Sequence, residues 1–349
     1  LRNRIIALKK SARYEGANFT HFRELLEERE SIVISYTTLS KILKGAGMVS
    51  KRTHRGTGRR FTRRKRRSRF GELVQADATP FDWFGDGERR ALHGFIDDAT
   101  GRIIGLYLCK NECLAGYLEL MRQTLTGYGI PLELYADKAG IFFVNTKKQE
   151  NWTVEECLAG KALTKTRFGA IADKLGIARI SAHTPQAKGR IERLWGTLQD
   201  RLPVWFALNG ITGTEQANAA LPAFIAKYNG TFAVPPESGE NAFVPMDEKD
   251  DLDTLLAVRH ERVTDNCGCF SFQNFTFRIV ADRPVAKKKI QFLFSEKTGF
   301  KAYYDKRYYP VELQGLTKGR KDTHLPDVTK LLLQKYYFSD GKGPGSAVA

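Results

Sequence analysis

The chain is short of acidic residues relative to basic ones. Its 349 residues include 39 Asp and Glu against 56 Lys and Arg, which leaves a formal net charge of +17. Such an excess disfavours a cationic partner and favours a polyanion, most often a nucleic acid. An anionic membrane surface is the alternative polyanion, but the positive charge does not lie on a convincing amphipathic helix.

Long hydrophobic runs are also missing. No apolar stretch approaches the roughly 18 residues of a membrane-spanning helix, and the amino terminus lacks the pattern of a signal peptide. We therefore expect a soluble cytoplasmic protein with no membrane partner. At 42% hydrophobic residues the chain can bury a real core and divide into two to four domains. It begins with Leu1 rather than Met, which indicates a fragment or missing upstream sequence.

Cysteine is scarce as well. The five cysteines are odd in number and scattered, which excludes a disulfide framework and is typical of a reduced compartment. They are Cys109, Cys113, Cys157, Cys267 and Cys269. Because Cys267-Gly-Cys269 has no second Cys or His pair at zinc-ligand spacing, we expect no metal there.

The segment from His183 to Leu202 has the spacing of an amphipathic helix. Thr184 is a good N-cap residue, Pro185 suits the first helical position, and Pro203 is expected to end the helix. Glu192 lies at the edge of the apolar stripe beside glycines, where a carboxylate can hold a metal ion against a phosphate. The alternative is a solvated charge. The stripe itself follows the helical period and consists of Ala187, Ile191, Leu194, Trp195, Leu198 and Leu202.

Two further acids favour the metal-binding interpretation of Glu192. Asp77 lies in Glu-Leu-Val-Gln-Ala-Asp-Ala-Thr-Pro and Asp137 in Leu-Glu-Leu-Tyr-Ala-Asp-Lys-Ala-Gly. Each follows a short β-forming segment and precedes small or turn-forming residues, so each is expected near the end of a strand. The arginines of the helix are expected to point into solvent; they are Arg190, Arg193 and Arg201.

Together these motifs resemble the DDE transposases and retroviral integrases, whose ribonuclease-H-like domain carries two Asp on neighbouring strands and a Glu on a later helix. The resemblance covers residues 71–203 and is most specific in Pro-Gln-Ala-Lys-Gly-Arg-Ile-Glu-Arg. It is closest to transposases of bacterial insertion sequences, with phage Mu transposase more distant. It assigns Asp77, Asp137 and Glu192 as the catalytic, metal-binding acids. Residues 141–165 look like an insertion relative to retroviral integrases.

The resemblance also implies an activity. The three acids would bind two Mg²⁺ ions, for which Mn²⁺ can substitute, and water would cut the DNA at each element end. The freed 3′ hydroxyl would then attack target DNA. Lys188 and Arg190 would position phosphate, and Arg193 would contact DNA. The protein would act as a homodimer or larger assembly on DNA, associated with the bacterial nucleoid.

Two other functions stay open. One is a catalytically inactive DNA-binding regulator, which the intact set of acids disfavours. The other is a nuclease of the same fold that cuts without joining, which the flanking DNA-binding parts disfavour.

The central region is expected to form an α/β fold, a ribonuclease-H-like mixed sheet with flanking helices over residues 71–203. Strands are expected near 71–81, 92–97, 103–108, 132–137 and 178–182, with helices near 114–125 and 166–175. The acids Asp82, Asp86, Asp97 and Asp98 occupy turn sequences, so we interpret them as structural. His93 and His183 are also interpreted as structural, although His183 at the entrance of the Glu192 helix could contact DNA.

Residues 1–48 are expected to form short helices after Asn18 and Ser35, which together resemble a helix-turn-helix. In that arrangement Thr37, Thr38 and Lys41 would face a DNA major groove. A plain helical hairpin is the alternative.

A basic linker is expected over residues 49–70. The stretch 51–69 carries eleven Lys or Arg and no acid, so it is expected to follow DNA phosphates rather than fold alone. A solvated tail is the alternative. The candidate DNA contacts are Arg59, Arg60, Arg63, Arg64, Lys65, Arg66 and Arg67.

The carboxy-terminal part is expected to contain a helical connector (204–257), a small β-barrel (258–325) and a tail (326–349). Thr214 is expected to cap the connector's helix, which is expected to end at Asn229-Gly230. Lysines 287–289 and the mixed basic and aromatic residues 303–308 suit nucleic acid, whereas packing on a partner subunit is the alternative. Residues 339–349 are expected to be disordered.

Overall fold

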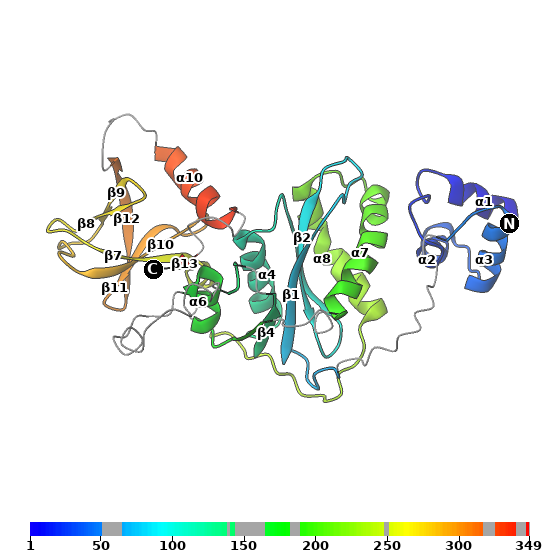
Figure 1. Cartoon of the computed structure of the whole chain (residues 1–349), viewed down its shortest axis with the longest axis horizontal. Helices are drawn as coiled ribbons and strands as arrows, with labels where there is room; N and C mark the ends of the chain where they lie inside the picture. Colours follow the sequence, from blue (N-terminus) through cyan, green and yellow to red (C-terminus); the bar gives the residue numbers. More distant parts are fainter. Residues whose placement is uncertain are drawn as a thin grey trace, which may run out of the picture.

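The computed structural model describes residues 1–50, 65–137, 140–143, 165–181, 189–247, 251–316, 325–339 and 347–348. Three bodies follow one another along the long axis: an amino-terminal helical body, a central α/β body and a carboxy-terminal β body (Figure 1). This order confirms the predicted succession of fold classes. In the described part of the chain, no helix has the length and apolar character needed to cross a bilayer.

The amino-terminal body contains helices α1 (Arg2–Lys10), α2 (Phe19–Glu30) and α3 (Tyr36–Gly45). Both predicted caps are confirmed. The Asn18 side chain accepts a hydrogen bond from the His21 N–H at 2.9 Å, and the Ser35 hydroxyl accepts one from the Thr38 N–H at 3.2 Å. The buried core of this body includes Ile5, Tyr14, Phe22, Leu26, Leu39 and Leu43.

The amino-terminal body packs on helix α7 (Gly189–Leu208) of the central body. Val204 belongs to the same apolar cluster as α2 and α3. Beside it, the Arg201 guanidinium donates two hydrogen bonds to the Glu24 carboxylate, one of them at 2.9 Å. The prediction that Arg201 faces solvent is therefore wrong, because its charge is paired across this contact.

The central sheet is a meander continued by parallel strands. Strands β3, β2 and β1 run antiparallel to one another, whereas β4 and β6 run parallel to β1. The strand order is β3-β2-β1-β4-β6. The strands are β1 (Leu73–Phe81), β2 (Arg90–Asp97), β3 (Ile103–Cys109), β4 (Glu133–Ala136) and β6 (Ala178–Ser181).

Helices cover both faces of this sheet. One face, with Val74, Ala76 and Leu134, packs against α4 (Leu114–Gly127) and α6 (Arg167–Lys174). The other face packs against α7 and α8 (Thr214–Phe232) through an apolar cluster. This cluster includes the predicted stripe residues Ile191, Leu194, Trp195, Leu198 and Leu202, all buried. Ala187 of the predicted stripe lies outside the described residues.

Two helices pass residues that were expected to end them. Helix α7 continues through Pro203 to Leu208, and α8 continues past Asn229-Gly230 to Phe232. Proline removes one backbone hydrogen bond and strains the preceding turn. In α7 the buried side chains of Val204 and Phe206 lie directly after the proline, so tertiary packing outweighs this local cost.

Side chains of α8 cover the free edge of the sheet. Asn218 donates to the Leu108 carbonyl at 3.0 Å and accepts from the Leu108 N–H at 2.7 Å. Asn229 does the same with Ile103, at 2.9 and 2.8 Å. Each amide thus takes the place of a neighbouring strand along the otherwise unpaired edge of β3.

The carboxy-terminal body is a nearly closed six-stranded antiparallel sheet. Its strand order is β7-β10-β11-β12-β9-β8, and the end strands β7 and β8 also approach each other. The predicted small β-barrel is therefore observed in this coarser form. The strands are β7 (Val258–Val263), β8 (Cys269–Phe272), β9 (Phe275–Ile279), β10 (Lys289–Ser295), β11 (Gly299–Tyr304) and β12 (Arg307–Leu316).

Helix α10 (Leu325–Tyr337) lies against this sheet, within the segment 326–349 that was expected to be a tail. The Tyr337 hydroxyl donates to the Phe294 carbonyl and accepts from the Val258 N–H at 2.9 Å. The neighbouring Tyr336 ring packs on Phe272 at 5.4 Å between ring centroids. Burial of these two aromatic rings accounts for the ordered helix.

Three short elements complete the described fold. They are β5 (Lys165–Thr166), α9 (Leu252–Leu255) and β13 (Ala347–Val348), which pairs with β5. Residues 144–164 are outside the described residues, so the insertion at 141–165 stays a prediction.

We predict that Asn218→Ala and Asn229→Ala will each destabilise the protein. Each removes two hydrogen bonds from partly buried backbone groups of β3, which costs about 1–3 kcal/mol. Denaturant unfolding measures the change. Asn3→Ala, on the exposed surface of α1, is the control and should change stability little. Equal stability of all three variants would show that the amides do not support the strand.

Candidate active site

Asp77 and Asp137 lie on neighbouring parallel strands. The register of β1 and β4 pairs Val74 with Leu134 and Gln75 with Tyr135. If this register continued by two residues beyond its last pair, Asp77 would lie opposite Asp137. Asp137 directly follows β4 as predicted, whereas Asp77 lies in the middle of β1 rather than near its end.

Helix α7 contacts this pair of acids through one polar side chain. Alternation along β1 turns Val74 and Ala76 toward α4, so Asp77 points to the opposite face, which α7 covers. There the Trp195 indole N–H donates a hydrogen bond to Asp77 Oδ2 at 2.9 Å. The hydrogen bond sets the position of the helix relative to the acid.

A glycine makes the approach of Trp195 possible. Gly94 is the cross-strand partner of Asp77 in the β1–β2 register. A Cβ atom at Gly94 would lie 2.5 Å from the Trp195 ring, which no side chain can tolerate without displacing the indole. The absence of a side chain at Gly94 is therefore part of the site.

Glu192 precedes Trp195 by three residues, so the two are neighbours on the surface of α7. Its side chain is exposed, while Ile191 beside it is fully buried. In the described residues the carboxylate oxygens of Asp77, Asp137 and Glu192 are not all within 4.8 Å of one another. Glu192 thus lies on the helix that contacts Asp77, but the three carboxylates are not gathered closely enough to form one compact group.

Glu112 is a fourth acid near the pair, and no sequence signal indicated it. It lies in the loop between β3 and α4, and the Tyr117 hydroxyl donates a hydrogen bond to its carboxylate at 2.7 Å. Burial raises the pKa of Glu112, and the negative charges of Asp137 and Asp77 raise this pKa further. The carboxylates of Glu112, Asp137 and Asp77 therefore lie in one region of negative potential.

Asp98 is the centre of a buried polar network. It is fully buried and accepts hydrogen bonds from the Arg67 N–H at 2.9 Å and from Gln75 Nε2 at 2.7 Å. It also forms an ion pair with Arg190 at 2.6 Å. Asp98 is structural, as predicted, but through this network rather than through its own turn. Arg190 was expected to face solvent, and that prediction is wrong because its guanidinium is paired.

The other turn acids match their predicted role. Asp97 accepts hydrogen bonds from the N–H groups of Gly71 and Thr100. Asp82 accepts from the N–H groups of Gly85, Asp86 and Gly87, and Asp86 accepts from the N–H of Glu88. These carboxylates stabilise turns and do not belong to the candidate site.

The end of the basic run is attached to the central body. Arg67 donates to Glu133 at 2.6 Å, Arg66 to the Ala99 carbonyl at 2.9 Å, and Lys65 pairs with Glu237 at 3.2 Å. Residues 65–69 are therefore attached to the central body, whereas a linker free to follow DNA phosphates was expected there. The remaining predicted contacts of the run, Arg59, Arg60, Arg63 and Arg64, lie outside the described residues, as does Lys188.

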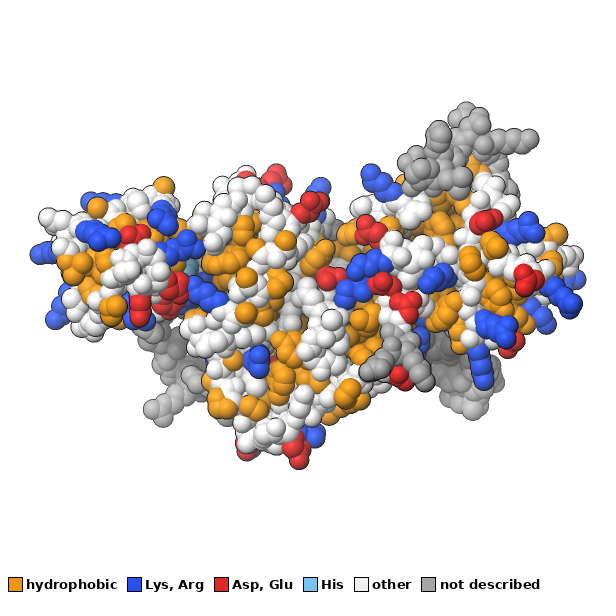
Figure 2. All heavy atoms as spheres, turned by 180° about the vertical axis from the view of Figure 1, so that it is seen from behind, with side chains coloured by type: hydrophobic (Ala, Val, Ile, Leu, Met, Phe, Trp, Pro, Cys, Tyr) orange, Lys and Arg blue, Asp and Glu red, His pale blue; other side chains and the backbone are white. Residues whose placement is uncertain are grey.

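Other predicted DNA contacts are available at the surface. Thr37, Thr38 and Lys41 are exposed on α3, and Arg193 is exposed on α7. In the view of Figure 2, Lys and Arg side chains gather on the two outer bodies and are sparse on the central body. Positive charge on this face is thus concentrated on the two outer bodies.

A second group of potential ligands is sulfur-rich and buried. His93, Cys109 and Cys113 have donor atoms within 4.8 Å of one another. His93 was expected to be an isolated structural histidine, and the cysteines were interpreted as scattered. The link between β3 and α4 brings Cys109 and Cys113 together, and β2 supplies His93, a proximity that spacing along the sequence does not reveal.

We predict that Asp98→Ala will destabilise the protein by about 3–5 kcal/mol, because it removes the fully buried partner of the partly buried Arg190 guanidinium and breaks the network around it. Denaturant unfolding tests this. The matched control is Asp86→Ala, which removes an exposed acid paired with Arg90 at 2.8 Å and should have little effect. A loss of similar size in both variants would contradict the assignment of Asp98 as the centre of the network.

Comparison with known proteins identifies relatives of the chain. The sequence matches no family model. It is 35% identical to the transposase for insertion sequence IS1202 of Streptococcus pneumoniae, covering 76% of this chain and 62% of the relative. It is also 35% identical to the putative transposase y4bF of Sinorhizobium fredii, covering 75% and 55%. The chain thus spans less than two thirds of the length of either relative.

Two solved structures show weaker similarity. The simian T-cell lymphotropic virus intasome in complex with PP2A regulatory subunit B56 gamma is 15% identical, with a TM-score of 0.37, over 90% of this chain and 100% of that chain. The HTLV-2 integrase catalytic core domain in complex with magnesium is 16% identical, with a TM-score of 0.29, over 43% and 84%. By its sequence relatives, the chain is related over three quarters of its length to bacterial transposases.

Proposed function

We propose that the chain is a DNA transposase that cuts the ends of its element and joins the freed 3′ hydroxyl to target DNA. In this proposal the central sheet is a ribonuclease-H-like catalytic fold, and Asp77, Asp137 and Glu192 are its metal-binding acids. The proposed substrate is DNA at the element ends and at the target. The working form is a homodimer or larger assembly on that DNA.

One observation carries the proposal more than any other. The parallel register of β1 and β4, continued by two residues, leads to Asp77 and Asp137, and Trp195 joins Asp77 to the helix that carries Glu192. Two carboxylates at strand spacing repel each other unless a cation lies between them. The strand register therefore supports a site for a positively charged ligand.

The donor set fits Mg²⁺. Carboxylate oxygens are the ligands that this hard cation prefers, and Mn²⁺ accepts the same set. When bound, two such ions supply activation of the attacking oxygen and stabilisation of the leaving oxygen. Asp77 and Asp137 would hold the metal from the sheet, and Glu192 would complete the site from α7.

The remaining residues orient the acids and the DNA. Trp195 fixes the position of one carboxylate oxygen of Asp77. Because Arg190 is paired with Asp98, we assign it to holding α7 on the sheet as well as to the predicted contact with phosphate. Arg193 is exposed next to Glu192 and is the better placed of the two to reach DNA.

We propose corresponding roles for the outer parts of the chain. Residues 1–48 would read the element ends through α3, residues 49–64 would contact phosphate, and 258–325 would bind DNA or a second subunit. The gathering of Lys and Arg on the two outer bodies supports this division.

We predict that Asp77→Asn, Asp137→Asn and Glu192→Gln will each lower DNA cutting and joining by at least about a hundredfold, the scale of losing one electrostatic group at a reacting centre. The substitutions preserve size but remove a charged oxygen ligand. The assay uses labelled element-end DNA, magnesium and a target plasmid, so that binding, cutting and joining are measured separately.

Asp86→Asn, in the exposed β1–β2 turn, is the matched control and should keep both activities. Thermal melting confirms that all variants are folded. Substantial joining by any one of the three acid variants would overturn the site. Binding without cutting by the unmodified protein would instead favour an inactive regulator, and cutting without joining would favour a nuclease.

We predict that changing Thr37, Thr38 and Lys41 together to Ala will lower the preference for element ends over random DNA by about tenfold, the value of a lost base contact. Competition binding against random DNA measures this preference. Lys10→Ala, an exposed lysine on α1, is the control and should weaken binding to both DNAs slightly and equally. Equal loss on both DNAs in the triple variant would remove the groove-reading role.

A further inference from the structure

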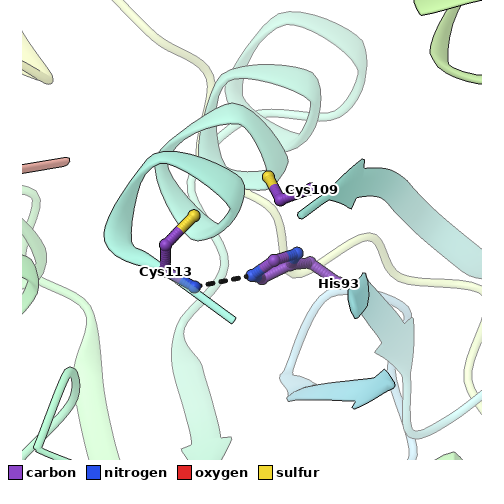
Figure 3. A group of neighbouring side chains, drawn as sticks. All are labelled: His93, Cys109 and Cys113. Carbon is purple, nitrogen blue, oxygen red and sulfur yellow. Dashed lines mark hydrogen bonds between the residues drawn. The ribbon is translucent and has the colours of Figure 1, made fainter. Parts of the chain in front are cut away.

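Three buried side chains from successive elements of the central body point toward one another (Figure 3). His93 lies in β2, Cys109 ends β3, and Cys113 precedes the first turn of α4. Their exposed fractions are 0%, 6% and 1%. The imidazole nitrogen and the two sulfurs lie within 4.8 Å of one another.

The chemistry of these donors is that of a zinc site. Zinc bonds of about 2.3 Å to sulfur in a tetrahedron place two sulfurs about 3.8 Å apart. A separation of at most 4.8 Å between donors therefore requires only a small contraction around the ion. Three protein ligands leave the fourth position to a small ligand such as water.

The orientation of His93 supports this assignment. Its Nδ1 lies 3.2 Å from the Tyr107 carbonyl, which can only accept, so Nδ1 carries the hydrogen. Its Nε2 consequently carries the lone pair, which accepts the Cys113 backbone N–H at 3.1 Å; a bound ion would take the place of this hydrogen bond. Histidines that bind metal commonly donate their other ring N–H to a backbone carbonyl in this way.

The ring of His93 is also locked by its neighbours. A Cβ atom at Gly116 would lie 2.6 Å from the imidazole, so α4 can rest on the ring only because this residue is glycine. On the same helix, the Tyr117 ring meets His93 edge to face, with centroids 4.8 Å apart. A disulfide or a pair of inert thiols would not require a fixed imidazole.

We propose that His93, Cys109 and Cys113 bind one soft divalent cation such as Zn²⁺, at a site separate from the carboxylates that would hold Mg²⁺. Sulfur and imidazole select Zn²⁺, whereas carboxylate oxygens select Mg²⁺, so the two sites differ in preference. The ion would tie β2, the end of β3 and the start of α4 together. This junction carries Glu112, the buried acid that shares the negative region of Asp77 and Asp137.

Metal titration of the full chain tests the proposal. The reduced, chelator-treated protein is titrated with Co²⁺, whose absorption spectrum reports thiolate ligands and tetrahedral geometry, and Zn²⁺ is then added in competition. We expect one equivalent of Co²⁺ with thiolate charge-transfer absorption, displaced by one equivalent of Zn²⁺. Zinc should also raise the melting temperature, because it binds the folded state.

Variants separate this cluster from the other cysteines. Cys109→Ser and Cys113→Ser should each weaken binding by at least about tenfold and remove the thiolate absorption. The matched control changes Cys157, Cys267 and Cys269 together to Ser and should bind as the unmodified chain does. If a cluster variant fails to fold, the control variant still tests the proposal through its Co²⁺ absorption spectrum and the shift of its melting temperature with Zn²⁺.

Two results would overturn the proposal. One is failure of the reduced, folded chain to bind stoichiometric Co²⁺ or Zn²⁺. The other is binding that is lost in the control variant and retained when Cys109 and Cys113 are both Ser. No DNA is present in this experiment, so its outcome is independent of the proposed transposase activity.

Discussion

The hydrogen bond from Trp195 to Asp77 is the interaction on which the central body depends. The indole reaches the carboxylate only because Gly94 has no side chain, and it extends from the helix whose apolar stripe covers one face of the sheet. The packing of α7 on the sheet therefore also determines where Glu192 lies relative to Asp77. A shift of α7 by one turn would have two effects at once. It would disrupt the packing of the apolar stripe, and it would move Glu192 away from Asp77.

A buried charge fixes the same helix at its amino-terminal end. Asp98 accepts from Gln75 of β1, from the backbone of Arg67 and from Arg190 of α7. Such a group is costly to bury and becomes tolerable only when every partner is in place. The network therefore couples the strand, the helix and the end of the basic run, so the segment leading from the amino-terminal body is anchored beside the candidate site.

The sequence predicted what depends on local chemistry and periodicity. The caps at Asn18 and Ser35 and the buried stripe of α7 follow from spacing alone. Continuation of α7 through Pro203 and the ordered α10 could not be predicted, because tertiary burial outweighs local preference there. The roles proposed for Asp77, Asp137 and Glu192 came from family resemblance; the structure adds the parallel register of β1 and β4, which leads toward the first two. Pairing of Cys109 with His93 required the register of β2 and β3, which no local pattern encodes.

The amides of Asn218 and Asn229 have a consequence for assembly. Two copies of a protein with an open sheet edge can join by adding strands to each other, which forms a continuous sheet across the dimer. In this chain the edge at β3 is already hydrogen-bonded to α8 within the same molecule. Two copies of the chain therefore cannot extend this sheet at β3 while α8 stays in place, and any association between copies would use another surface.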